Sequence, residues 1–434
     1  MRWLLVGLMT LLITTDFTGR NVGLGPGLSV KNVLLYVAVM VLAFRITLAG
    51  GFRLRMPGLH LAWAVWIGYA ILTWLTVSVV VHYYGYDPIL SAMGLKAELI
   101  DLALFCFVAF YGVQTEADYQ VVLRGLAAVI GMSSILTLTD LVGITNLGLR
   151  VGDSGAEADR VFGAFGNANE TGALLALMLP MLVATTLSGR GLWRIAGFAF
   201  TAASVAVFVL TISRGAYVAV VVGYPIAAYL LRHLIPPGRI VAWTVGIFGA
   251  AVVGAGVLAI VDPPAMWAMA DRVLGIGTMG ISEASSGRSD IWGMALNTMM
   301  DSPLSLLTGF GWNAWSTMPT VFVLHNTYLD QWFNLGLVGL IVYIALEYMT
   351  ITNAKRAAAL AAPPIRGDMM ACVFGMMALA VAVLFGNLFI SRPYIWMYVG
   401  LILRETVLIA DRAAEAAPRP APRTVQLGTA WRRA

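Results

Sequence analysis

Long apolar runs separated by polar connections make up most of the chain. Twelve runs are candidate spans: residues 2–15, 31–49, 58–82, 96–113, 119–142, 171–187, 192–212, 215–231, 240–261, 328–349, 369–389 and 393–410. A helix of about 20 apolar residues crosses a hydrocarbon layer of about 30 Å, whereas barrel strands would show as short alternating segments. The pattern predicts an all-α integral membrane protein with about twelve transmembrane helices.

Composition supports this class. The 434 residues are 60% hydrophobic and 11% charged, whereas about a quarter of the residues in a soluble domain are charged. Cys106 and Cys372 lie inside apolar runs, which predicts core positions and neither a disulfide framework nor a metal site. In a membrane protein the net charge of +5 mainly reports topology and does not indicate nucleic-acid binding.

Basic residues concentrate in alternate connections. With a cytoplasmic N-terminus, the inner connections are rich in arginine and lysine and the outer ones are poor, as the positive-inside rule requires. Both termini are therefore expected in the cytoplasm. The inner residues are Arg53, Arg55, Arg190, Arg194, Arg232, Arg239, Lys355, Arg356 and Arg366. Residues 412–434, rich in Ala, Pro and Arg, are expected to form a disordered cytoplasmic tail.

Two outer loops are longer than a connection requires, and long loops usually carry function. The first covers residues 143–170, and the second, residues 262–327, is the largest soluble piece. Within the second, residues 265–274 and 290–300 have apolar positions at helical spacing, which predicts short amphipathic helices. The expected parts are N-terminal helices (1–142), central helices (143–261), the large loop (262–327), C-terminal helices (328–411) and the tail.

His325 lies where the large loop ends and an apolar run begins. If that run is a helix, His325 and Asn326 are at its N-terminus, where free amides and the positive end of the dipole disfavour a charged imidazole. A neutral imidazole accepts a proton, so His325 is a candidate general base. The alternative is that His325 only caps or anchors the helix.

Outer basic residues need an explanation other than topology. They are Arg20, Lys31, Lys96, Arg150, Arg160, Arg214, Arg272, Arg288 and Arg392. Arg214 lies between two apolar runs on a tight Ser-Arg-Gly turn, which places its guanidinium at the membrane boundary. Its alternative role is snorkelling to water or lipid phosphate. Gly215 beside it allows a close approach to the backbone.

Arg288 is at the predicted start of a short helix, with Asp290 in the first turn. It either belongs to a plain capped surface helix or binds an anion. Guanidinium pairs bind phosphate oxygens in bidentate fashion, so Arg214 and Arg288 together suit a diphosphate. Arg160 is a weaker third candidate. Asn167, Asn169 and Glu170 could cap the next span or bind a sugar, and for Asn169 and Glu170 we favour the cap.

These residues together indicate a chemistry. Outward arginines, a neutral histidine and long loops on apolar helices suit a substrate with a lipid tail, a diphosphate and a polar head. The arginines would stabilise the departing diphosphate, while His325 removes a proton from a hydroxyl. No carboxylate pair or His/Cys cluster in the sequence calls for a metal or another cofactor.

Four segments together resemble the O-antigen ligase family, which shares a superfamily with Wzy-type polymerases. They are His-Asn followed after nine residues by Gly-x-x-Gly (residues 325–339), Ser-Arg-Gly (213–215), GNANETG (166–172) and GRSDIW (287–292), which ends in Trp292. The resemblance implies a multi-spanning GT-C-type glycosyltransferase of a bacterial inner membrane with a periplasmic active site. His325 would be the base, and Arg214 and Arg288 would bind the diphosphate.

The resemblance also implies metal-independent, inverting transfer of a glycan from undecaprenyl diphosphate to a hydroxyl. The first hypothesis is an O-antigen ligase with lipid A core as acceptor, and the second is a Wzy-type polymerase of O-antigen or exopolysaccharide, whose acceptor is a second lipid-linked glycan. The third is a lipid-linked sugar transporter, which should carry ionisable groups near mid-membrane. Arg45, Asp101 and Glu347 are expected toward span ends, which disfavours transport.

Overall fold

The computed structural model shows an all-α membrane architecture, as predicted. It describes residues 1–18, 23–25, 28–49, 51, 53–147, 160–163, 167–236, 238, 256, 267, 287–317, 323–386 and 392–416. Within these residues, eight helices are long and apolar enough to cross a membrane. They are α2 (Val30–Leu48), α3 (Pro57–Thr76) continued by η1 (Val77–Val81), α6 (Glu116–Leu141), α7 (Ala168–Ser188), α8 (Leu192–Leu210), α16 (Thr327–Leu360), α17 (Ile365–Ala382) and α19 (Pro393–Ala416).

Shorter elements complete the described chain. They are α1 (Arg2–Thr18), the antiparallel pair β1 (Gly23–Gly25) and β2 (Leu28–Ser29), α4 (Pro88–Leu95), η2 (Lys96–Ile100), α5 (Asp101–Gly112), α9 (Arg214–Leu230), α13 (Arg288–Asp301), α14 (Ser305–Thr308) and α15 (Ala314–Thr317). Each predicted span except residues 240–261 corresponds to a helix. Apart from the single residues 256 and 267, that span and the predicted helix over residues 265–274 lie outside the described residues, whereas the one over 290–300 corresponds to α13.

Small residues bring the central helices close together. An added Cβ on Gly400 of α19 would lie 2.2 Å from the Cys106 carbonyl oxygen in α5, and one on Gly375 of α17 would lie 2.2 Å from that of Leu177 in α7. Such close backbone approach is typical of helix packing in membranes. Cys106 and Cys372 are free and buried, as predicted. The backbones of α5 and α19, and those of α7 and α17, therefore approach each other closely at these glycines.

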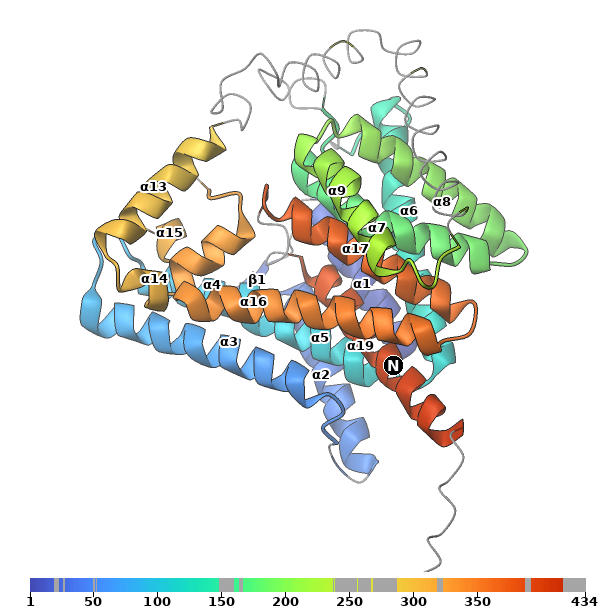
Figure 1. Cartoon of the computed structure of the whole chain (residues 1–434), viewed down its shortest axis with the longest axis horizontal. Coiled ribbons are helices and arrows are strands. Elements are labelled where there is room, and N and C mark those ends of the chain that lie inside the picture. Colours follow the sequence, from blue (N-terminus) through green and yellow to red (C-terminus); the bar gives the residue numbers. More distant parts are fainter. Residues whose placement is uncertain are drawn as a thin grey trace, which may run out of the picture.

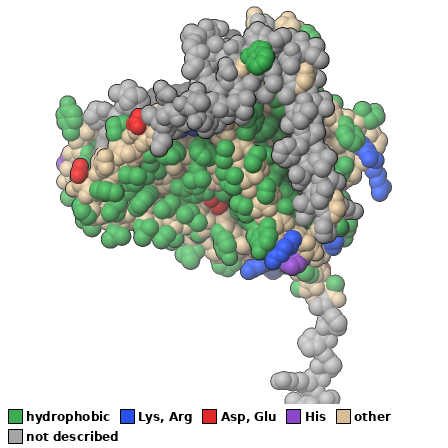
Figure 2. Space-filling view, turned by 45° about the horizontal axis from the view of Figure 1, so that its top comes forward, with side chains coloured by type: hydrophobic (Ala, Val, Ile, Leu, Met, Phe, Trp, Pro, Cys, Tyr) green, Lys and Arg blue, Asp and Glu red, His purple; other side chains and the backbone are tan. Residues whose placement is uncertain are grey.

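Four of the ion pairs among the described residues lie at one end of the bundle. They join Arg2 to Asp118, Arg55 to Asp411, and Arg412 to Glu116 and Glu405. Arg55 lies in a connection that was predicted to be rich in positive charge and Arg412 in the predicted tail, whereas Glu116 and Asp118 lie in a connection without Lys or Arg. In Figure 2, hydrophobic side chains cover the middle of the visible face, and Lys and Arg side chains lie mostly toward one side of it. These ion pairs thus lie where the N-terminal ends of α1, α3 and α6 meet the C-terminal part of α19.

Figure 1 shows α3 and α16 running side by side, with α13, α14 and α15 gathered at one end of this pair. Within α16, Gly336 has φ 60° and ψ −157°, a backbone conformation that suits glycine. The amide groups of Phe310 and Gly311 donate to the carbonyls of Phe333 and Asn334, each at 2.9 Å, and so satisfy groups near the break.

The break divides α16 into two helical segments, where the sequence predicted one uninterrupted span over residues 328–349. The Gly-x-x-Gly sequence causes the difference, because Gly336 leaves the helical conformation. A second correction concerns Glu347, which was expected toward a span end. Glu347 lies inside the second segment with 4% of its surface exposed. The Tyr328 hydroxyl of the first segment donates to it at 2.8 Å.

Candidate active site

Arg214 is the first residue of α9. Ser213 is the N-cap, and its hydroxyl accepts from the amide of Ala216. Ile212, which precedes Ser213, has a φ of 45°, and this backbone conformation is uncommon for a β-branched residue. The tight turn predicted between two apolar runs is thus present between α8 and α9, and it holds Arg214 at a helix N-terminus.

Arg288 begins α13 in the same way. Gly287 is the N-cap residue, with φ 75°, and Asp290 lies in the first turn, as predicted. Trp292 lies one helical turn further, on the same side of α13 as Arg288. Its indole Nε1 donates to the Leu324 carbonyl at 2.8 Å. Because Leu324 precedes His325, this bond connects the helix of Arg288 to the candidate base.

His325 lies immediately before α16 and has φ 49°, a left-handed conformation that is costly for a residue with a side chain. The next residue, Asn326, is the N-cap of α16, and its side chain accepts from the amide of Leu329 at 3.0 Å. The cap predicted for this position is therefore supplied by Asn326, and His325 has no capping role in the described helix. Strained backbone of this kind persists where surrounding contacts enforce it, and it often marks functional sites.

The end of α17 brings these helix starts together. Thr327 donates from its amide to the Val383 carbonyl and from its hydroxyl to the Gly386 carbonyl, both at 2.9 Å. An added Cβ on Gly215 would lie 2.9 Å from the Phe385 Cβ. The close approach predicted at Gly215 is therefore made by Phe385 of the same chain. Residues 383–386 link the start of α9 to the start of α16.

Electrostatic interactions give a second measure of the same arrangement. Burial lowers the pKa of Arg288, and the positive charge of Arg214 lowers it further. Burial also lowers the pKa of His325 below its ordinary value; Arg288 adds to this effect and Glu170 opposes it. The lowered pKa favours the neutral form of the imidazole. Arg288 therefore lies within electrostatic range of both Arg214 and His325, which belong to other parts of the chain.

The first residues of α7 do not have the capping roles that we predicted for them. Asn167 is the N-cap of α7, and its side chain accepts from the amide of Asn169 at 2.8 Å. Asn169 itself accepts at Oδ1 from Arg160 at 2.7 Å and from the Ser213 hydroxyl at 3.1 Å. Glu170 forms an ion pair with Arg392. The cap assignment for Asn169 and Glu170 is wrong, because α7 starts at Ala168 and both side chains are used between elements.

Arg160 is 5% exposed and also donates to the Thr211 carbonyl at 3.1 Å. It fastens the segment before α7 to the end of α8, while its part in diphosphate binding stays a prediction. Among the outward basic residues, Arg20, Arg150 and Arg272 lie outside the described residues. The structure adds Arg392 and Thr327 to the site. Arg392 precedes an apolar span, as Arg214 does, but Thr327 carries no comparable signal in the sequence.

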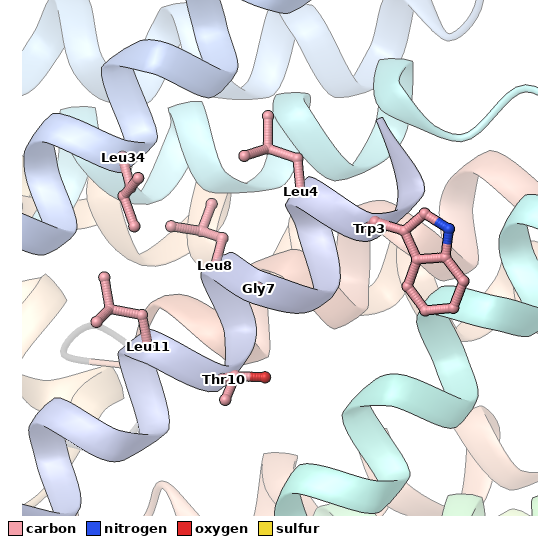
Figure 3. Close-up of a pocket in the computed structure, with 7 residues that line it drawn as sticks. All are labelled: Trp3, Leu4, Gly7, Leu8, Thr10, Leu11 and Leu34. Carbon is pink, nitrogen blue, oxygen red and sulfur yellow. The ribbon is translucent and has the colours of Figure 1, made fainter.

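Figure 3 shows an apolar hollow formed by α1 and α2. Leu4, Leu8 and Leu11 of α1 line it together with Leu34 of α2. It is open to the outside, and none of the predicted site residues contributes to its lining.

The described helices define a multi-pass, all-α membrane protein. Residues 199–344 match the family model described as O-antigen ligase. The resemblance to the O-antigen ligase and Wzy-type family is thereby confirmed over a segment that contains Arg214, Arg288 and His325. No curated protein matches the chain. The match supports a membrane enzyme of the ligase or polymerase type.

Proposed function

We propose that this protein is a glycosyltransferase that moves a glycan from undecaprenyl diphosphate to an acceptor hydroxyl. The observation that carries the proposal is the convergence of two arginines and one neutral histidine inside the matched segment. Two guanidinium groups repel each other, so their proximity suits an anion with several oxygens. A neutral imidazole beside them can accept a proton.

The proposed reaction is a single displacement with inversion at the anomeric carbon. His325 takes the proton of the acceptor hydroxyl as the oxygen attacks the anomeric carbon. A new carbon–oxygen bond forms on one face, while the bond to the diphosphate breaks on the other. The electron pair stays with the diphosphate, whose growing negative charge is stabilised by Arg214 and Arg288. Because two guanidinium groups supply this positive charge, the step is proposed to be metal-independent.

The proposed orientation places the active site in the periplasm and both termini in the cytoplasm of a bacterial inner membrane. Its support is the distribution of charge in the bundle. Arg55, Arg190, Arg366 and Arg412 lie at the end opposite to Arg214 and His325 in the alternation of helices. Positive residues favour the cytoplasmic side.

The proposed acceptor is lipid A core, in keeping with the family description O-antigen ligase. The test uses purified protein with an undecaprenyl diphosphate-linked glycan, with and without lipid A core. A ligase gives a single modified acceptor that appears only when the core is present. A ladder of repeat units on the lipid carrier, formed without the core, would instead identify a Wzy-type polymerase, and no transfer to either acceptor would reject the proposal.

A further inference from the structure

Glu170 and Arg392 form an ion pair at the site end of the bundle. Glu170 lies in the first turn of α7, and Arg392 immediately precedes α19, so the pair joins two helices that are far apart in sequence. The Arg392 side chain is 17% exposed and the Glu170 side chain 29%. Partial burial reduces solvent screening of the pair, and partial exposure leaves both groups within reach of a ligand.

A hydrogen bond connects the first turn of α7, which carries Glu170, to the turn before Arg214. Asn169, next to Glu170, accepts from the Ser213 hydroxyl at 3.1 Å, and Ser213 immediately precedes Arg214. Glu170 also interacts electrostatically with His325, which in turn interacts with Arg288. The five ionisable groups thus follow one another in the order Arg392, Glu170, His325, Arg288 and Arg214.

We propose that Arg392 is a third diphosphate-binding arginine, which Glu170 holds in place until the donor arrives. This inference rests on the proposed function. It concerns residues outside the matched segment 199–344, so the family match does not bear on it.

Competition between two anions explains how the pair would work. A carboxylate carries one negative charge, whereas a diphosphate offers more charge and more oxygen atoms to a bidentate guanidinium. When the donor binds, the Arg392 guanidinium transfers from Glu170 to a phosphate oxygen. When the glycan leaves, the diphosphate ends with an additional negative charge, and a third arginine stabilises the product side of the displacement.

Opposite effects of two substitutions distinguish this role from a structural one. Arg392→Gln should weaken binding of undecaprenyl diphosphate about 10-fold or more, because a charge-assisted hydrogen bond contributes about 1.5–3 kcal/mol. Glu170→Gln should tighten binding about 3-fold, because it removes the competing anion. If the pair only joined α7 to α19, both substitutions would act in the same direction through loss of that contact.

The experiment measures binding of undecaprenyl diphosphate to the purified full-length protein and its variants in detergent. Arg412→Gln is the matched control, because Arg412 pairs with Glu116 among the ion pairs at the opposite end. We expect the control to bind like the wild type. The exchanged pair Glu170→Arg with Arg392→Glu should bind weakly. Wild-type affinity in the exchanged pair, or unchanged affinity in Arg392→Gln, would overturn the inference while leaving the proposed function intact. A wild-type protein that does not bind the lipid would overturn both.

Discussion

The Tyr328 hydroxyl donates to Glu347 at 2.8 Å, although the two residues are 19 positions apart in α16. In a straight helix, 19 residues span about 28 Å. The contact therefore requires the first segment of α16 to fold back along the second. Tyr328 also donates to the Ala380 carbonyl of α17 at 3.0 Å. Both bonds fix the segment that starts two residues after His325.

Removing this hydroxyl should destabilise the site end. Tyr328→Phe leaves a buried carboxyl group without this donor, so we expect a loss of about 1–3 kcal/mol in stability. The loss would appear as a lower thermal unfolding temperature in detergent. Tyr348→Phe is the control, because Tyr348 is 68% exposed on the same helix. Equal unfolding temperatures for the two variants would contradict the proposed bracing role of Tyr328.

The break at Gly336 should be intolerant of any side chain. A Cβ there would lie 2.2 Å from the Leu307 carbonyl oxygen, and φ is +60°. Gly336→Ala should therefore reduce the yield of folded protein sharply. Gly68→Ala in α3 provides the comparison, because nothing lies within 4 Å of the added Cβ. Alanine in a helix is more favourable than glycine, so this variant should fold at least as well as the wild type. Normal folding of Gly336→Ala would mean that α16 can be straight.

The Trp292 to Leu324 hydrogen bond should matter for turnover more than for donor binding. Trp292→Phe removes the Nε1 donor but keeps an aromatic ring, so α13 still packs while the backbone before His325 loses one restraint. We expect kcat to fall about 10-fold, because small displacements of a catalytic group are costly, while donor affinity stays within about 2-fold. Steady-state kinetics with varied donor provide the measurement. An unchanged kcat would show that His325 is positioned by other contacts.

The pH profile should report the charges around His325. Burial and Arg288 lower its pKa, so the neutral base persists below the ordinary pKa of 6.5, and kcat/KM should fall only on further acidification. Glu170 raises the pKa, hence Glu170→Gln should move this acid limb to lower pH. Arg288→Gln should move it to higher pH. Shifts in the reverse directions, or no shift in either variant, would exclude His325 as the group that titrates.

The positions of the helices were predicted well from the sequence, but the break inside α16 was not. Apolar length alone located the described spans, because a membrane helix must form its backbone hydrogen bonds within itself and must span a fixed thickness of hydrocarbon. The break in α16 was missed, although Gly336 and Gly339 were noticed, because periodicity does not show whether a glycine leaves the helix. That depends on the loop of Phe310 and Gly311, whose amides complete the broken backbone.

The candidate site was predicted in part for a related reason. Arg214 and His325 were found because each is a polar residue beside an apolar run, and Arg288 because it begins a predicted short helix in the large loop on the same predicted side. The Glu170 pair with Arg392 was missed, because it joins residues 222 positions apart. Asn169 was assigned as a cap because local sequence favours that role, whereas tertiary contacts with Arg160 and Ser213 decide its position.

The central claim is that His325 is the base of a glycosyl transfer supported by the neighbouring arginines. The most direct test compares the wild type with His325→Ala in two assays on the same purified samples: binding of undecaprenyl diphosphate and transfer of glycan from the lipid-linked donor to its acceptor. The account predicts that donor binding persists within a few-fold while transfer falls by about 10²–10⁴. Transfer by His325→Ala at a rate near that of the wild type would contradict it.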